Sequence, residues 1–153
     1  MITQQQLGGY VGKGIAEICQ NAYTSHADNH CAHFVSHVIG SKFGTTCRML
    51  GNGQGDAATL RAPQLFARCA SVGVWSLRPA SLTTCLVFMT RASNVNLAGK
   101  VMANAPRTHV GVFAGGFIWH YSNQHHHVVR QTPSQFARHY PAPDNAMFYG
   151  SLP

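Results

Sequence analysis

The sequence predicts an α+β fold in which helices come first and an antiparallel sheet follows. Three observations indicate this order: helical spacing of apolar residues before residue 70, short apolar runs after residue 84, and glycine turns between those runs. The chain has 153 residues, of which 45% are hydrophobic. That length is enough to bury one core, so we expect a single domain over 1–153.

Three segments of the N-terminal half carry apolar residues at helical spacing, which predicts helices over 9–22, 31–39 and 57–70. Gly40 is placed to end the second of these helices, and Pro63 lies near the start of the third. The polar stretches 24–30 and 41–56 are expected to be loops. Residues 51–55 are rich in glycine but lack the Lys-Ser/Thr of a phosphate-binding loop, so we expect a flexible rim there.

The C-terminal half predicts strands over 84–89, 110–114, 117–122, 128–131 and 147–152, with a short helix over 133–139. Gly115 and Gly116 form a two-residue hairpin signal between two of these strands. A hairpin closing at that turn would pair Ala114 with Phe117. The strands after residue 84 therefore predict an antiparallel meander.

The chain carries a formal charge of +7, with four acidic residues and ten histidines. A basic surface favours an anionic partner such as a wall polymer, an acidic lipid or a nucleic acid. The basic residues are scattered singly, so we expect no sequence-specific nucleic-acid binding. No apolar run approaches the roughly 18 residues of a membrane span, and the first residues lack the pattern of a signal peptide. We therefore expect no membrane span, and a cytoplasmic location in the producing cell.

The cysteines and histidines do not show the spacing of a metal site. None of the five cysteines forms a CxxC pair, and Cys19, Cys69 and Cys85 lie in apolar patterns typical of core residues. His33 and His37 share a face of the predicted helix 31–39, but the sequence offers no third ligand beside them, so we interpret them as helix-surface or groove-lining residues. Residues 125–127 are consecutive histidines whose side chains would alternate in direction. We expect no metal and no cofactor.

A cysteine and a histidine stand where a nucleophile and its base would be needed. Cys31 would open the helix 31–39, where unpaired N–H groups favour a thiolate. His109 would open a strand, where its imidazole could take and return a proton. His120 follows across the glycine turn, near the same end of the adjacent strand, and could orient His109. Asn123 and Tyr121 are competing candidates for that role, and the alternative for Cys31 is a buried structural cysteine.

Three motifs together resemble the NlpC-type papain-like peptidases and amidases, which cut peptide bonds in the stems of bacterial peptidoglycan. They are the segment Asn-His-Cys-Ala-His-Phe-Val-Ser over 29–36, the strand His-Val-Gly-Val-Phe over 109–113, and a histidine after the glycine turn. The resemblance covers about residues 23–123. It implies a papain-like fold with Cys31 as nucleophile, His109 as base and His120 as the third catalytic residue. Asn29, His30 and Asn123 would support the site or bind substrate.

The chain departs from that family pattern at the residues around the nucleophile. His30 stands where the family often has aspartate, and Ala32-His33 replaces Ser-Gly. The string around Cys31 also resembles the lipid acyltransferases related to lecithin–retinol acyltransferase. In those enzymes the catalytic histidine precedes the cysteine, whereas here His109 follows it. We therefore expect a peptidoglycan amidase or endopeptidase, with thioester acyl transfer on lipid or protein and a non-catalytic basic binding module as alternatives.

The resemblance also implies partners and a destination. Peptidoglycan stem peptides would be the substrate. A compact basic hydrolase without a signal peptide fits an antibacterial effector injected by a machine such as type VI secretion, or a phage lysis or tail enzyme. Either route would bring it to a bacterial periplasm or cell wall. An injected toxin would imply an immunity protein that covers the cleft.

Overall fold

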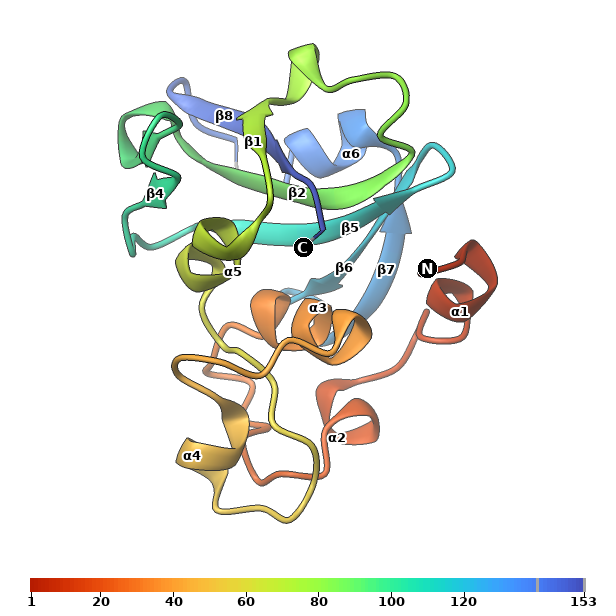
Figure 1. The fold of residues 1–153 in the computed structure, drawn as a ribbon. Helices are drawn as coiled ribbons and strands as arrows, with labels where there is room; N and C mark the ends of the chain where they lie inside the picture. The colour runs from red at the N-terminus through yellow and green to blue at the C-terminus, as the bar shows by residue number, and fades with distance from the viewer. Residues whose placement is uncertain (140, 153) are drawn as a thin grey trace.

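The computed structural model describes residues 1–139 and 141–152 and has an α+β fold, with N-terminal helices packed on a six-stranded antiparallel sheet. Figure 1 shows α3 against one face of the sheet and α6 over the other. The helices are α1 (Gln4–Gly8), α2 (Ile15–Ile18), α3 (Cys31–Ile39), α4 (Cys47–Gly51), α5 (Ala62–Arg68) and α6 (Pro133–Ala137). No helix among these residues is long and apolar enough to cross a membrane.

The large sheet has the strand order β1-β8-β2-β5-β6-β7, and each neighbouring pair is antiparallel. Its strands are β1 (Val72–Val74), β2 (Thr84–Arg91), β5 (His109–Ala114), β6 (Phe117–Ser122), β7 (His127–Gln131) and β8 (Asn145–Gly150). A separate small sheet pairs β3 (Val95–Asn96) with β4 (Val101–Met102). The strand β8 returns between β1 and β2, so the last strand of the chain completes the sheet.

Two apolar clusters cover the two faces of the sheet. The larger one lies between α3 and the sheet and includes Phe34, Val110 and Trp119. The smaller one lies under α6 and includes Phe113 and Phe136. Since successive side chains of a strand point to opposite faces, His109 lies on the α6 face while its neighbour Val110 faces α3.

The predicted central helix and hairpin are confirmed. Helix α3 spans Cys31–Ile39, and Gly40 ends it in the left-handed conformation with a φ of 70°. Gly115 and Gly116 both have positive φ at the turn between β5 and β6, and Ala114 pairs with Phe117 as predicted. These elements were predictable because their signals are local and strong.

Other element predictions were wrong in extent. The predicted helix over 9–22 is split into α1 and α2, because Gly12 takes a φ of 84° and Gly14 caps α2. The predicted helix over 57–70 begins at Ala62, since Thr59 is extended and bridges to Thr46. The predicted loop over 41–56 contains α4. The strand expected over 147–152 is β8, which begins and ends two residues earlier, and β1, β3 and β4 were not predicted.

The fold predicts a specific intolerance at Gly111, in the middle of β5. A Cβ added there would lie 2.7 Å from Cγ2 of Ile118 and 3.0 Å from the backbone oxygen of Trp119. We expect Gly111→Ala to lower the free energy of unfolding by about 1–3 kcal/mol, the usual cost of overpacking. Urea denaturation measures it. The control is Gly8→Ala, whose added Cβ meets nothing within 4 Å and which should leave the midpoint almost unchanged.

Candidate functional site

Cys31 is the first residue of α3, and its sulfur lies against the main chain on either side of His109. The side chain is almost fully buried, at 2% exposure. Its Sγ lies 3.8 Å from the carbonyl oxygen of Thr108. Backbone N–H groups of Val110 and Ala32 also donate to the sulfur. The packing of α3 on the sheet therefore brings the thiol to the start of β5.

The sulfur reaches this position where β5 and β6 no longer form a ladder. Their pairing runs from Ala114 with Phe117 to Val112 with Trp119. Beyond that point β6 continues in a ladder with β7 alone, through Ser122. The main-chain groups at the first residues of β5 are thus available to Cys31 on α3.

The two predicted histidines lie together on the α6 face of the sheet. Nε2 of His109 is 2.7 Å from Nδ1 of His120, and Nε2 of His120 is 2.6 Å from Oε1 of Gln131 on β7. The amide oxygen can only accept, so Nε2 of His120 donates to it. In the neutral ring Nδ1 of His120 then accepts from Nε2–H of His109. These two hydrogen bonds place the lone pair of neutral His109 on Nδ1, the atom that a general base would use.

Burial keeps both imidazoles neutral. The His109 ring stacks on His139 at 4.5 Å between centroids and on Phe136 of α6 at 5.4 Å. Burial, and then the neighbouring rings of His120 and His139, lower the pKa of His109 well below 6.5. Burial likewise lowers the pKa of His120 to about 4, although its bond to Gln131 acts in the opposite direction.

The thiol is also neutral, contrary to the expectation that the helix start would favour a thiolate. Burial raises the pKa of Cys31 to about 11 and outweighs the N–H groups that donate to the sulfur. In the part of the chain that the structure describes, this thiol makes no hydrogen bond with the ring of His109. The structure therefore shows a protonated thiol beside the backbone of His109 while the imidazole lies on the other face of the sheet, so the thiolate–imidazolium pair is not formed.

Asn29 and Asn123 form a clamp that holds the loop before α3. Oδ1 of Asn29 accepts from the Cys31 N–H at 3.0 Å and from Nδ2 of Asn123 at 3.0 Å. Oδ1 of Asn123 in turn accepts from the His30 N–H at 2.9 Å, and Nδ2 of Asn29 donates to the Thr108 carbonyl at 3.4 Å. The clamp fixes the nucleophile loop to both strands of the hairpin. The Cys31 N–H at the start of α3 donates to Asn29 in this structure.

The structure separates the three candidates for the orienting role. His120 contacts His109 directly, whereas Asn123 bonds to the loop before α3. The Tyr121 hydroxyl accepts from the backbone of Ile15, on the other face of the sheet. His30 is buried, and its Nε2 donates to the Ser25 carbonyl at 2.7 Å, so it supports the loop.

Gln131 is a site residue that the sequence prediction missed. His120 pairs with Val129 across β6 and β7, and Gln131 lies two positions further on the same face. A polar residue at that spacing was visible in the sequence. Its contact with His120 depends on the register of β7 against β6, which no local sequence signal predicts.

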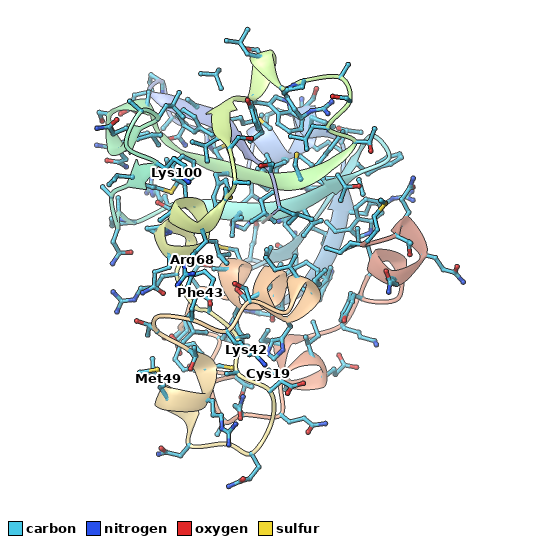
Figure 2. The ribbon with its side chains drawn as sticks, in the orientation of Figure 1. Cys19, Lys42, Phe43, Met49, Arg68 and Lys100 are labelled. Carbon is cyan, nitrogen blue, oxygen red and sulfur yellow. The ribbon has the colours of Figure 1, made fainter. Side chains whose placement is uncertain are left out.

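A cleft of about 400 Å³ opens beside Cys31. Its walls come from the start of α5, the loop before β5 and the start of α3, and they include Asn29, Arg61 and Arg107. Arg107 holds a φ of 60°, an uncommon backbone conformation for a residue with a side chain. A larger cavity of about 1000 Å³ is lined by α1 and by Lys42, Phe43 and Arg68, labelled in Figure 2, and does not include Cys31.

His109, His120 and His139 each place one ring nitrogen within 4.8 Å of those of the other two, close enough for a metal site. Two histidine nitrogens on a tetrahedral zinc lie about 3.3 Å apart, given bonds of about 2.0 Å. The nitrogens of His109 and His120 lie 2.7 Å apart, the separation of a shared proton. The arrangement therefore suits proton transfer better than metal binding.

No protein-family model, curated protein or solved structure matches this chain.

The buried histidine pair predicts a pH dependence of stability. Below pH 6.5 an unfolded His120 takes up a proton, whereas the folded ring stays neutral down to about pH 4. As the pH is lowered from 6.5 to 4, the free energy of unfolding should fall by about 3 kcal/mol because of His120. Above pH 6.5 and below pH 4 the contribution of His120 should not change with pH. Chemical denaturation at several pH values measures the fall. Nitrogen NMR of the imidazoles should show both rings protonated at Nε2 at pH 6, and a titration of His120 near 6.5 would contradict this.

Proposed function

We propose that this protein is a papain-like cysteine hydrolase of the NlpC type, an amidase or endopeptidase that cuts peptide bonds in bacterial peptidoglycan. One observation carries the proposal. The sulfur of Cys31 is held against the backbone of His109, whose imidazole is oriented by His120 and Gln131. A candidate nucleophile beside a cleft and a candidate base with its orienting residues thus lie at the start of one strand, on its two opposite faces.

The neutral state of both groups favours general-base catalysis. As the sulfur attacks the amide carbonyl, Nδ1 of His109 takes the thiol proton, and the S–H electron pair forms the S–C bond. The imidazolium then returns the proton to the leaving amine as the C–N bond breaks. Water hydrolyses the resulting thioester with His109 again as base. His120 stabilises the charged His109 by accepting from its Nε2–H.

The His109 ring lies on the α6 face of β5 and the Cys31 thiol on the α3 face, so proton transfer between them requires the first residue of β5 to turn its side chain toward α3 when substrate binds. A substrate in the cleft would also compete with Asn29 for the Cys31 N–H. That N–H, at the start of α3, would then hold the oxyanion.

Charge supports an anionic peptide as the substrate. Arg61 and Arg107 line the cleft, and guanidinium groups bind carboxylates in a bidentate manner. Peptidoglycan stems carry free carboxylates, and the overall charge of +7 attracts the anionic wall. We place the activity in a bacterial periplasm or cell wall, reached as an injected effector or a phage lysis enzyme. A cognate immunity protein of an effector would cover this cleft.

Removal of the nucleophile or of the base tests the proposal directly. We expect Cys31→Ala and His109→Ala each to lower the release of muropeptides from purified peptidoglycan at least about a thousandfold, because neither variant can form the thioester efficiently. Mass spectrometry of the digests measures it. The matched controls are Cys85→Ala, which removes a buried sulfur from the other core, and His127→Ala on β7.

Each variant must show the wild-type circular dichroism spectrum. Full activity of folded Cys31→Ala would refute the cysteine mechanism. A wild-type protein that forms an acyl-enzyme from a lipid thioester but releases no muropeptides would assign the chain to acyl transfer instead.

The hydrogen bonds that orient His109 predict a separate effect of a change at Gln131. Gln131→Leu removes the acceptor for Nε2–H of His120, so the tautomer chain through His109 is no longer fixed. We expect kcat to fall roughly tenfold to a hundredfold while KM changes little, since Gln131 does not line the cleft. The control is Gln124→Leu at an exposed position. An unchanged kcat in a folded Gln131→Leu protein would show that the chain does not act on catalysis.

A further inference from the structure

A second cluster of reactive side chains lies on the opposite side of α3 from the sheet. It consists of Cys19, His33, His37 and Cys47, each with one sulfur or nitrogen atom within 4.8 Å of those of the other three. The members come from the end of α2, from α3 and from the start of α4. Figure 2 shows Cys19 below α3, on the side away from the sheet. His33 is fully buried, so its predicted place on the helix surface or in a groove was wrong.

His33 presents a buried nitrogen lone pair that no other group satisfies. Nε2 of His30 donates to the Ser25 carbonyl, so Nδ1 of neutral His30 is an acceptor. It lies 3.1 Å from Nδ1 of His33, which therefore carries the proton. The remaining lone pair of His33 is on Nε2, which is buried and has no hydrogen-bond partner among the described residues. A ligating histidine has this arrangement, with one nitrogen donating to an outer group and the other open to the metal.

The sulfur of Cys47 is surrounded by N–H donors. Nδ2 of Asn21 lies 3.2 Å from it, and the backbone N–H of Ala58 lies 3.3 Å from it. N–H groups directed at a sulfur are the outer contacts that metal-bound cysteines commonly receive. Nε2 of His37 lies 4.0 Å from the same sulfur.

We propose that Cys19, His33, His37 and Cys47 bind one structural Zn²⁺ in tetrahedral His₂Cys₂ coordination. Zinc bonds of about 2.0–2.3 Å place tetrahedral ligand atoms about 3.3–3.8 Å apart, so the four atoms need only small movements to reach this geometry. Binding releases the two thiol protons and forms two Zn–S and two Zn–N bonds. Two thiolates neutralise the ion, as a buried site requires. Two nitrogen and two sulfur ligands with no open position suit zinc in a structural role.

The site would join the segment before α3 and the segment after it to the helix that carries Cys31. The helices α2 and α4 are each five residues or fewer, and such short helices gain stability from packing or from a cross-link. The zinc site does not depend on the proposed hydrolase activity, and its tests use metal content, spectra and melting rather than activity.

The metal content of the full protein tests this inference. After refolding with Zn²⁺ and dialysis, inductively coupled plasma mass spectrometry should give about one zinc per chain. The Co²⁺ form should show the visible bands of tetrahedral cobalt and a thiolate-to-cobalt band in the near ultraviolet. We expect His37→Ala and Cys47→Ser to weaken zinc affinity at least about tenfold, the effect of losing a ligand or its support. In the wild type, zinc removal should lower the melting temperature.

Two controls separate this site from other zinc-binding groups. Cys69→Ser, at a buried cysteine outside the cluster, should retain the metal and the thiolate band. The triple change of residues 125–127 to alanine should do the same, because that tract offers no sulfur. Zinc content near zero in the refolded wild type, or a cobalt spectrum without a thiolate band, would overturn the inference. A Cys19–Cys47 disulfide in freshly purified protein that reduction does not convert to a zinc-binding form would also overturn it.

Discussion

The packing of α3 against β5 is the contact on which the rest of this structure depends. It buries Phe34 and Val110 in the larger core and brings the first turn of the helix to the first residues of the strand. The two sides of α3 contact different parts of the structure. The side toward the sheet delivers Cys31 to the backbone of His109, while the far side presents His33 and His37 to α2 and α4. A shift of one helical turn along β5 would remove the sulfur from the histidine.

Burial decides the charge state of the site. Both the thiol and the imidazole of the proposed pair are neutral, because α3 and α6 exclude water from the two faces of the sheet. The helix start and the N–H groups of Val110 and Ala32 are not enough to keep Cys31 ionised at this depth. The hydrogen bonds from His109 through His120 to Gln131 determine which nitrogen of neutral His109 holds the lone pair. In the proposed mechanism, a correctly oriented neutral base therefore replaces the ion pair.

Local signals in the sequence were enough to predict the elements that carry the site. The start of α3 at Cys31, its end at Gly40 and the Gly115-Gly116 hairpin each follow from a few neighbouring residues. The histidine pair followed from the hairpin, because the turn places His109 and His120 near one end of adjacent strands. The glycines before Ile15 were visible too, but the apolar spacing outweighed them in the prediction of one long helix.

Features that depend on distant segments could not be predicted in the same way. Gln131 reaches His120 only through the register of β7, and the Asn29–Asn123 clamp joins residues far apart in the chain. The two cysteines beside His33 and His37 come from α2 and α4, whose positions no periodicity gives. Long-range packing thus brings residues with the sequence pattern of ordinary core or surface positions into the two proposed sites.

We propose that Cys31 and His109 act together as nucleophile and base. The most direct measurement uses a stem-peptide analogue in which an electrophilic ketone replaces the scissile amide, followed by intact-protein mass spectrometry and peptide mapping. We expect one adduct, on Cys31, that forms in the wild type and is largely lost in folded His109→Ala. An adduct on another cysteine, or one that forms at the same rate without His109, would contradict it.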